Sequence, residues 1–174
     1  MPPITADRLV VLLREYVRQT GSRVDLLLVG GLALQAYGFP DRATQDRDGE
    51  IMGDPEPLAQ YLRKPQVPAD LGENMSGWSV VAMPPGYRDR TSAFLDEPGL
   101  HVRLLAPTDF VIAKLRRGTE LDLEDALHVA RRFGVQASAV QAAADAAIGV
   151  SPKDTALFAF RRIVQLFCGR LTAA

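Results

Sequence analysis

Apolar residues near the start of the chain recur at helical spacing and then form a continuous run. Thr5 or Asp7 is suited to cap a helix, and Gly21 is suited to end it. The apolar stripe between these ends consists of Leu9, Leu12, Leu13, Tyr16 and Val17. The apolar run at 24–29 follows directly and predicts a buried strand. The pattern therefore predicts an opening helix followed by a strand.

The following segment, up to residue 106, mixes short helical and strand patterns. The predicted elements are helices at 31–37 and 55–62 and strands at 44–52, 79–83, 91–95 and 100–105. Proline and glycine residues between 64 and 77 make that stretch loop-like. The last two strands flank Asp96-Glu-Pro-Gly99 and predict a hairpin.

Beyond Pro107 the pattern becomes helical throughout. The predicted helices are 108–116, 121–133, 137–148 and 152–171, separated by glycines. The whole chain is therefore expected to be α+β, with a mixed α/β core at 1–106. A C-terminal helical part at 107–174 is expected to pack on that core as one compact unit.

Composition narrows the class of protein. The 174 residues are 47% apolar with a net charge of −1, which suits a globular domain without a basic field for nucleic acid. One cysteine excludes an internal disulfide framework, and two histidines with one cysteine do not suit a structural zinc site. No apolar run approaches the roughly 18 residues of a membrane span, and the N-terminus does not have the pattern of a signal peptide. We expect a cytoplasmic protein without a membrane partner.

The most informative motif joins a glycine pair to two aspartates. Gly30-Gly31 ends the apolar run, and Asp46-x-Asp48 follows on the next predicted strand. Residues i and i+2 of a strand share a face, so the two carboxylates are expected side by side. A hard divalent cation resolves their repulsion and takes oxygen ligands shared with substrate phosphates. The glycines allow a tight turn whose backbone approaches a ligand closely.

Each half of this motif also has an ordinary structural explanation. A glycine pair after a strand is usually only a turn, and aspartate is common in turns. Their order and spacing together favour a metal-assisted nucleotide site.

A second motif begins at Pro107-Thr108-Asp109, which predicts a helix start. Lys114 follows among apolar neighbours, where its charge either reaches solvent or points at an anion such as a triphosphate. Asp122 and Asp125 lie one helical turn apart and are able to orient Lys114 or to assist the acceptor. The plainer interpretation is a solvated lysine, with acids placed where helix N-termini favour them.

These motifs resemble those of the AbiEii-like, or minimal, nucleotidyltransferases of the polymerase-beta-type superfamily. The resemblance rests first on Gly30-Gly31 and on Arg42-Ala-Thr-Gln-Asp-Arg-Asp48. It continues in Pro107-Thr-Asp109, Lys114-Leu115 and Asp122-Leu-Glu-Asp125, and Met83 to Arg90 is similar to the segment that precedes this helix in uncharacterised relatives. Together these motifs cover roughly residues 24 to 133.

The resemblance implies a nucleotidyltransferase fold, a small twisted mixed sheet flanked by helices. It implies that Asp46 and Asp48 hold Mg²⁺ or Mn²⁺ and that Lys114 and Asp125 complete the catalytic set. It also implies that Gly30 and Gly31, together with Arg42 and Thr44 of the same motif, bind the nucleotide. It further implies a nucleoside triphosphate as donor and a tRNA or protein acceptor. Relatives include type IV toxins, so a cognate antitoxin is a further expected partner.

The chain departs from the superfamily at two points. Arg47 stands between the aspartates, where an apolar residue is usual. The third carboxylate of the superfamily has no clear match, and Asp89 and Glu50 are the two alternatives.

Two functions follow as alternatives. The first is Mg²⁺-dependent transfer of a nucleotidyl group to RNA or protein, with a type IV toxin-like role as one form of this function. The second is a catalytically reduced relative that binds nucleotide or a partner without turnover. A hydrolase is disfavoured because the chain has neither a Gly-x-Ser-x-Gly elbow nor a Gly-Lys-Ser/Thr phosphate loop.

Overall fold

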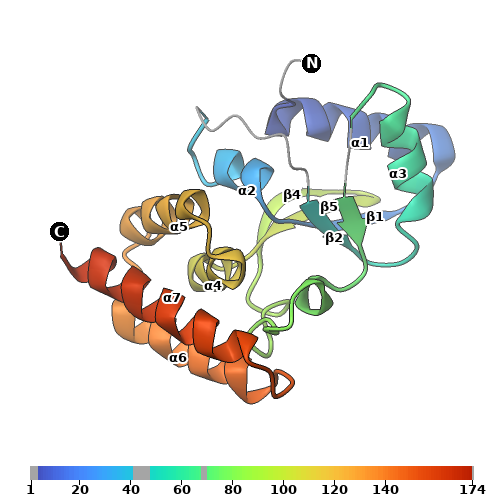
Figure 1. Ribbon diagram of the computed structural model, residues 1–174. Helices are drawn as coiled ribbons and strands as arrows, with labels where there is room; N and C mark the ends of the chain where they lie inside the picture. The colour runs from blue at the N-terminus through green and yellow to red at the C-terminus, as the bar shows by residue number, and fades with distance from the viewer. Residues whose placement is uncertain (1–3, 41–47, 68–69, 174) are drawn as a thin grey trace. The chain divides into compact units, whose positions relative to one another are not determined.

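The computed structural model describes residues 4–40, 48–67 and 70–173 (Figure 1). The chain divides into two compact units. The first unit comprises Met1–Asn74 and Thr91–Leu104, and the second comprises Met75–Arg90 and Leu105–Ala174. The chain therefore enters the second unit, returns to the first for a short segment and then completes the second.

The first unit is built on a mixed five-stranded sheet. Its elements are α1 (Ala6–Thr20), β1 (Val24–Leu28), α2 (Gly31–Ala36), β2 (Asp48–Ile51), α3 (Glu56–Arg63), β3 (Asp70–Gly72), β4 (Ser92–Glu97) and β5 (Leu100–Leu104). The strand order is β3-β2-β1-β5-β4. β1 is antiparallel to β2 and parallel to β5, β2 is parallel to β3, and β4 is antiparallel to β5. This mixed sheet, with the helices of the C-terminal half, confirms the predicted α+β class.

The opening helix begins and ends at predicted residues. The Thr5 hydroxyl accepts a hydrogen bond from the Arg8 backbone N–H at 3.1 Å, which satisfies one of the free donors of the first turn. Gly21 adopts a left-handed conformation with φ of 67° and donates to the Val17 carbonyl. Leu9, Leu12 and Leu13 are buried on one side of α1, as the helical spacing predicts.

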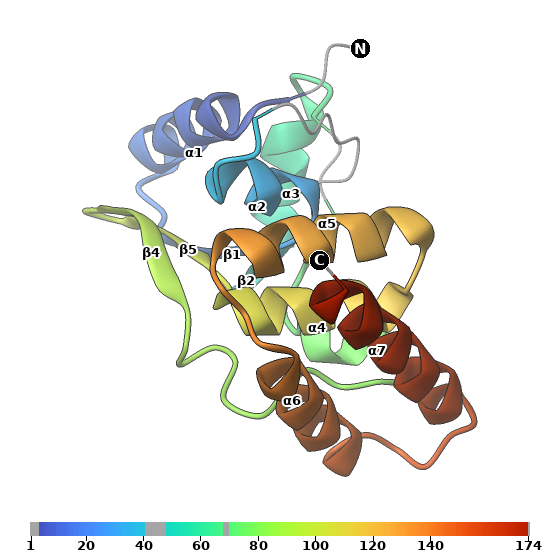
Figure 2. The ribbon, with the colours of Figure 1, turned by 90° about the vertical axis from the view of Figure 1, so that its left-hand side faces the viewer.

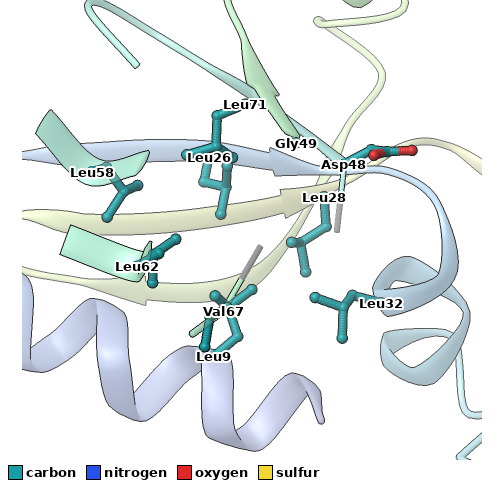
Figure 3. A pocket seen from close by; sticks show the side chains of 10 residues that line it. All are labelled: Leu9, Leu26, Leu28, Leu32, Asp48, Gly49, Leu58, Leu62, Val67 and Leu71. Atoms are coloured by element: carbon teal, nitrogen blue, oxygen red, sulfur yellow. The ribbon is translucent and has the colours of Figure 1, made fainter. Parts of the chain in front are cut away.

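The core of the first unit lies on one face of the sheet. Leu26 and Leu28 of β1 and Leu58 and Leu62 of α3 line an apolar pocket of about 10 Å³ together with Leu9 of α1 (Figure 3). α1 and α3 therefore cover the same face. Full burial of one leucine contributes about 1.5–3 kcal/mol, so this layer supplies much of the stability of the unit.

The second unit is helical. Its elements are a 3₁₀ turn, η1 (Met75–Trp78), and the helices α4 (Pro107–Arg117), α5 (Glu120–Arg132), α6 (Ala137–Gly149) and α7 (Ala156–Thr172). α4 and α5 lie side by side, as do α6 and α7 (Figure 2). Their shared core contains Val111, Ile112, Leu115, Leu123, Ala126, Val140, Ala144, Phe160, Val164 and Phe167. The four predicted C-terminal helices are confirmed, and α7 begins at Ala156 rather than at residue 152.

The strand predicted at 79–83 is wrong, because side chains take the place of a strand partner. Val81 N–H donates to the Ser79 hydroxyl, Ala82 N–H to the Ser151 hydroxyl and Met83 N–H to the Ser76 hydroxyl. These bonds satisfy the backbone donors that a sheet would otherwise have satisfied.

Arg116 of α4 satisfies the carbonyl groups of the same segment. Its Nε donates to the Val81 carbonyl at 2.7 Å, and its Nη2 donates to the Met75 and Ser76 carbonyls at 2.9 Å each. Burial lowers the pKa of Arg116 to about 10, so the guanidinium stays charged at neutral pH. Arg116 thus binds the backbone at both ends of residues 75–81, which consist of η1 and the loop that follows it.

The loop expected over 64–77 also needs correction, since it contains β3 and the first three residues of η1. β3 has only three residues and pairs with β2, from Asp48 opposite Asp70 to Glu50 opposite Gly72. A strand this short shows no alternation in the sequence, so its partner strand defines it.

Candidate functional site

The glycine turn after β1 has a backbone conformation that only glycine adopts readily. Gly30 has φ of 73° and ψ of −150°, and α2 begins at Gly31. Gly30 is the N-cap of α2 and provides no side-chain cap. The strand, tight turn and short helix predicted around Gly30-Gly31 are therefore confirmed.

The carboxylate of Asp48 lies directly against this turn. The backbone N–H of Val29 donates to the Asp48 carbonyl at 3.0 Å, which ties the end of β1 to the start of β2. A Cβ atom placed on Gly30 would lie 3.3 Å from Asp48 Oδ2. Figure 3 shows the Asp48 carboxylate directed away from the leucine side chains of the pocket. The missing side chain of Gly30 thus leaves room for an acid beside bare backbone.

A second aspartate joins Asp48 at the same edge of the sheet. Asp70 is the register partner of Asp48 in the parallel pair β2–β3, so both side chains project from the same face. Asp70 is exposed, as a ligand-binding group needs to be. The sequence does not reveal Asp70 as a site residue, because the prolines and glycines around it are typical of a loop. A usable signal was available, because a strand followed by a helix often leads into a parallel strand.

The two alternatives for a third carboxylate occupy different settings. Glu50 follows Asp48 on the same face of β2, is 4% exposed and lies opposite Leu27 of β1. Asp89 is exposed in the turn that precedes β4 and belongs to the second unit. Asp89 is therefore not on a strand next to Asp48, whereas Asp70 is.

Three residues of the predicted site, Arg42, Thr44 and Asp46, lie outside the described residues. Their roles stay predictions, as does the shared strand face of Asp46 and Asp48. Within 4–40, 48–67 and 70–173, no group of three or more histidine, cysteine, aspartate or glutamate side chains is placed to hold a metal ion. The donor chemistry of Asp48 and Asp70 nevertheless suits Mg²⁺, which prefers carboxylate oxygens.

In the second unit, Lys114 forms a buried cluster with two aspartates. Its Nζ lies 2.9 Å from Asp125 Oδ2 and 3.4 Å from Asp122 Oδ1. Lys114 is 9% exposed, and the two aspartates are 2% and 4% exposed. Asp122 and Asp125 therefore both contact the Lys114 ammonium, and Lys114 is buried rather than solvated. A role of this cluster in the functional site stays a prediction.

Asp122 has a second task at the start of α5. Its side chain accepts from the backbone N–H and the hydroxyl of Thr119, and the Thr119 hydroxyl accepts from the Asp122 N–H, forming a capping box. Asp122 thus joins a helix cap to the buried ammonium of Lys114.

The Pro107-Thr108-Asp109 motif also has a structural task. Asp109 is 2% exposed and accepts two hydrogen bonds of 2.8 Å from Arg90, one from Nε and one from Nη2. This carboxylate raises the pKa of Arg90 above its usual value. The motif therefore anchors the end of the segment from Met83 to Arg90 to the first turn of α4.

A family model provides the comparison that decides the class. The model described as "Nucleotidyltransferase of unknown function (DUF6036)" matches residues 8–142, which is well over half of the chain. The chain belongs to this family.

Membership in the DUF6036 family places the chain among nucleotidyltransferases and confirms the resemblance at that level. The closer likeness to AbiEii-like proteins stays a prediction. Among solved structures, the chain is similar to the crystal structure of an antigenic nucleotidyltransferase-like protein from Paracoccidioides brasiliensis. That likeness has 17% identity and a TM-score of 0.47 and covers 95% of this chain and 86% of the other.

Two further findings concern curated proteins and membrane-spanning helices. No curated protein matches the sequence significantly. No helix in the described part of the chain is both long enough and apolar enough to cross a membrane.

Proposed function

We propose that this DUF6036 protein transfers a nucleotidyl group from a nucleoside triphosphate to an acceptor hydroxyl, with Mg²⁺ or Mn²⁺ as cofactor. The observation that carries the proposal is the Asp48 carboxylate lying 3.3 Å from the position of a Cβ on Gly30. An acid beside a glycine turn suits a metal-bound phosphate, because the bare backbone lets the phosphate approach its carboxylate ligand.

Different residues of the first unit bind the triphosphate, supply the metal ligands and take the proton. The backbone of Gly30 and Gly31 holds the triphosphate, and Asp46 and Asp48 supply the metal ligands. We assign Asp70 as the third carboxylate because it shares a face with Asp48 on the neighbouring strand. When bound, the metal neutralises phosphate charge and lowers the pKa of the acceptor hydroxyl. The acceptor oxygen bonds to the α-phosphorus as pyrophosphate leaves, and Asp70 takes the hydroxyl proton.

We also assign Arg42 and Thr44 to nucleotide binding and Lys114 and Asp125 to the catalytic set, as the resemblance implies. The buried ion pairs of Lys114 support a fixed orientation for its ammonium. An RNA, tRNA in particular, or a protein is the proposed acceptor, and a type IV toxin role implies a cognate antitoxin. Expression that arrests growth in wild type but not in Asp48→Asn would support the toxin role.

The test is a transfer assay with each radiolabelled nucleoside triphosphate, total RNA or cell lysate, and Mg²⁺. We expect label transfer by wild type and loss of transfer in Asp46→Asn, Asp48→Asn and Asp70→Asn. Asp7→Asn is the matched control, because Asp7 is an exposed aspartate in the first turn of α1. A wild type that is inert yet stabilised by nucleotide with Mg²⁺ would instead favour the reduced, binding-only protein.

A further inference from the structure

Arg103 places a cation on the same face of the sheet as the candidate site. The register runs from Glu50 on β2 to Leu27 on β1 and to Arg103 on β5. Register partners share a face, so Arg103 projects from the face of Glu50 and Asp48. Its neighbours Val102 and Leu104 are buried toward the opposite face, which excludes the other orientation.

Arg103 also lies near the same edge as the glycine turn. β1 and β5 are parallel, so their carboxyl ends meet at one edge, where antiparallel β2 begins with Asp48. Arg103 is the last residue but one of β5. Two strand spacings separate β5 from β2, about 10 Å in all, so the cation and the acid stand on opposite sides of β1.

The guanidinium of Arg103 is held in place while staying exposed. Its Nε donates to the Thr91 hydroxyl at 2.6 Å, and its Nη2 donates to the Thr91 carbonyl at 3.3 Å. No carboxylate in the described residues forms an ion pair with Arg103. Two other exposed arginines of the first unit differ in this respect, since Arg14 pairs with Glu97 and Arg23 pairs with Asp25.

We propose that Arg103 binds a phosphate group of the nucleoside triphosphate, as the cationic side of a site whose acidic side is Asp48 and Asp70. The identity of this ligand rests on the proposed function. A pre-oriented guanidinium suits phosphate because it is planar, always charged and able to donate two hydrogen bonds at once. Thr91 is a positioning residue that sets the direction of this guanidinium.

The binding test uses titration calorimetry with inorganic tripolyphosphate and with nucleoside triphosphates in Mg²⁺. We expect Arg103→Gln to weaken both ligands by about tenfold or more, and Arg103→Lys to restore part of the loss. Thr91→Val should weaken binding less than Arg103→Gln, because the charge remains. Arg23→Gln is the matched control and should bind as wild type does, since Arg23 lies at the opposite end of β1.

Kinetics separate this inference from the proposed function. We expect Arg103→Gln to raise KM for the nucleotide about tenfold and to leave KM for the acceptor unchanged. Active transfer with an unchanged nucleotide KM, or with a raised acceptor KM alone, would overturn the role of Arg103 and leave the function standing. An inert wild type that binds tripolyphosphate through Arg103 would overturn the function and support the phosphate site. A wild type that binds neither ligand would overturn both.

Discussion

The first unit places the acids of the candidate site, Asp48 and Asp70, on one face of neighbouring strands, and the second unit places its acids in buried ion pairs. Asp109 receives two hydrogen bonds from Arg90, and Asp122 and Asp125 share Lys114. Like charges directly opposite each other on neighbouring strands destabilise the fold. A buried ion pair is different, because the fold is strongly destabilised when one of its partners is removed. The charged clusters of the second unit therefore have a structural task, and Lys114 and Asp125 combine it with the catalytic role proposed above.

The largest expected effect on stability comes from Lys114→Met. Removing the ammonium leaves two buried carboxylates without it, which should lower the free energy of unfolding by about 3–5 kcal/mol. Urea unfolding followed by the fluorescence of Trp78, which belongs to the second unit, measures the change. Lys153→Met is the control, since Lys153 is exposed. A decrease in the free energy of unfolding of less than about 1 kcal/mol would argue against a structural role for the cluster of Lys114, Asp122 and Asp125.

The next largest effect is expected for Gly118→Ala. Gly118 has φ of 67°, and an added Cβ would lie 2.4 Å from Ile163 Cδ1. Strain and overpacking together should cost about 1–3 kcal/mol in urea unfolding.

Gly134→Ala separates the cost of backbone strain from the cost of overpacking. Gly134 has φ of 65°, but nothing lies within 4 Å of an added Cβ. Gly134→Ala should therefore show the backbone term alone, about 1 kcal/mol. Equal losses in both variants would show that Ile163 moves aside freely.

In the first unit, Gly30→Ala should impair transfer more than stability. Gly21 is in the left-handed helical region, so Gly21→Ala should lose about 1 kcal/mol. Gly30 has ψ of −150°, a region that is essentially restricted to glycine, so Gly30→Ala should lose about 1–3 kcal/mol. Only at Gly30 would the new Cβ approach the Asp48 carboxylate. A transfer assay beside thermal melts should show activity lost in Gly30→Ala and kept in Gly21→Ala. Equal activity in the two variants would argue against a nucleotide at the turn.

Asp48→Asn should abolish transfer and raise stability slightly when metal is absent. The variant removes one of two like charges at register partners of neighbouring strands, an effect of about 0.2–1 kcal/mol. Melting curves in EDTA beside transfer assays in Mg²⁺ measure the two effects. Full transfer by Asp48→Asn would disprove the metal-assisted mechanism.

The smallest effects concern one surface ion pair in each unit. Hydrogen bonds from Arg14 lower the pKa of Glu97, and those from Arg170 lower the pKa of Glu120. Because the folded pKa is depressed, each pair stabilises the fold above the unfolded pKa and stops doing so as pH falls through the folded pKa. In Arg14→Gln, NMR titration should show a higher Glu97 pKa and an unchanged Glu120 pKa. Arg170→Gln should show the reverse, and movement of both in either variant would contradict independent pairs.

Local signals predicted most of the elements. Thr5, Gly21 and Pro107 mark helix ends through their own backbone chemistry, so single residues were enough. The hairpin at 91–105 was equally accessible, because Asp96-Glu-Pro-Gly99 separates two apolar runs.

The errors arose where distant side chains decide the backbone. Arg116, from a helix about 40 residues later, holds the carbonyls of 75–81, and no local pattern contains that bond. β3 exists because β2 pairs with it, and this pairing brings Asp70 beside Asp48. Local sequence patterns were therefore enough to predict the glycine turn and to select Asp48 as a site residue. They were not enough to select Asp70 and Arg103, because the neighbours of these residues come from other strands.

The order in which the units appear along the chain has a consequence for synthesis. β5 is central in the sheet, between β1 and β4, yet it emerges from the ribosome only after residues 75–90. A nascent chain that ends at residue 90 therefore exposes the β5-facing side of β1, which carries unpaired backbone groups. Any continuous fragment with the whole sheet also carries 75–90, whose partners Ser151 and Arg116 come later. The two units are distinct in their contacts, but no single cut of the chain separates them intact.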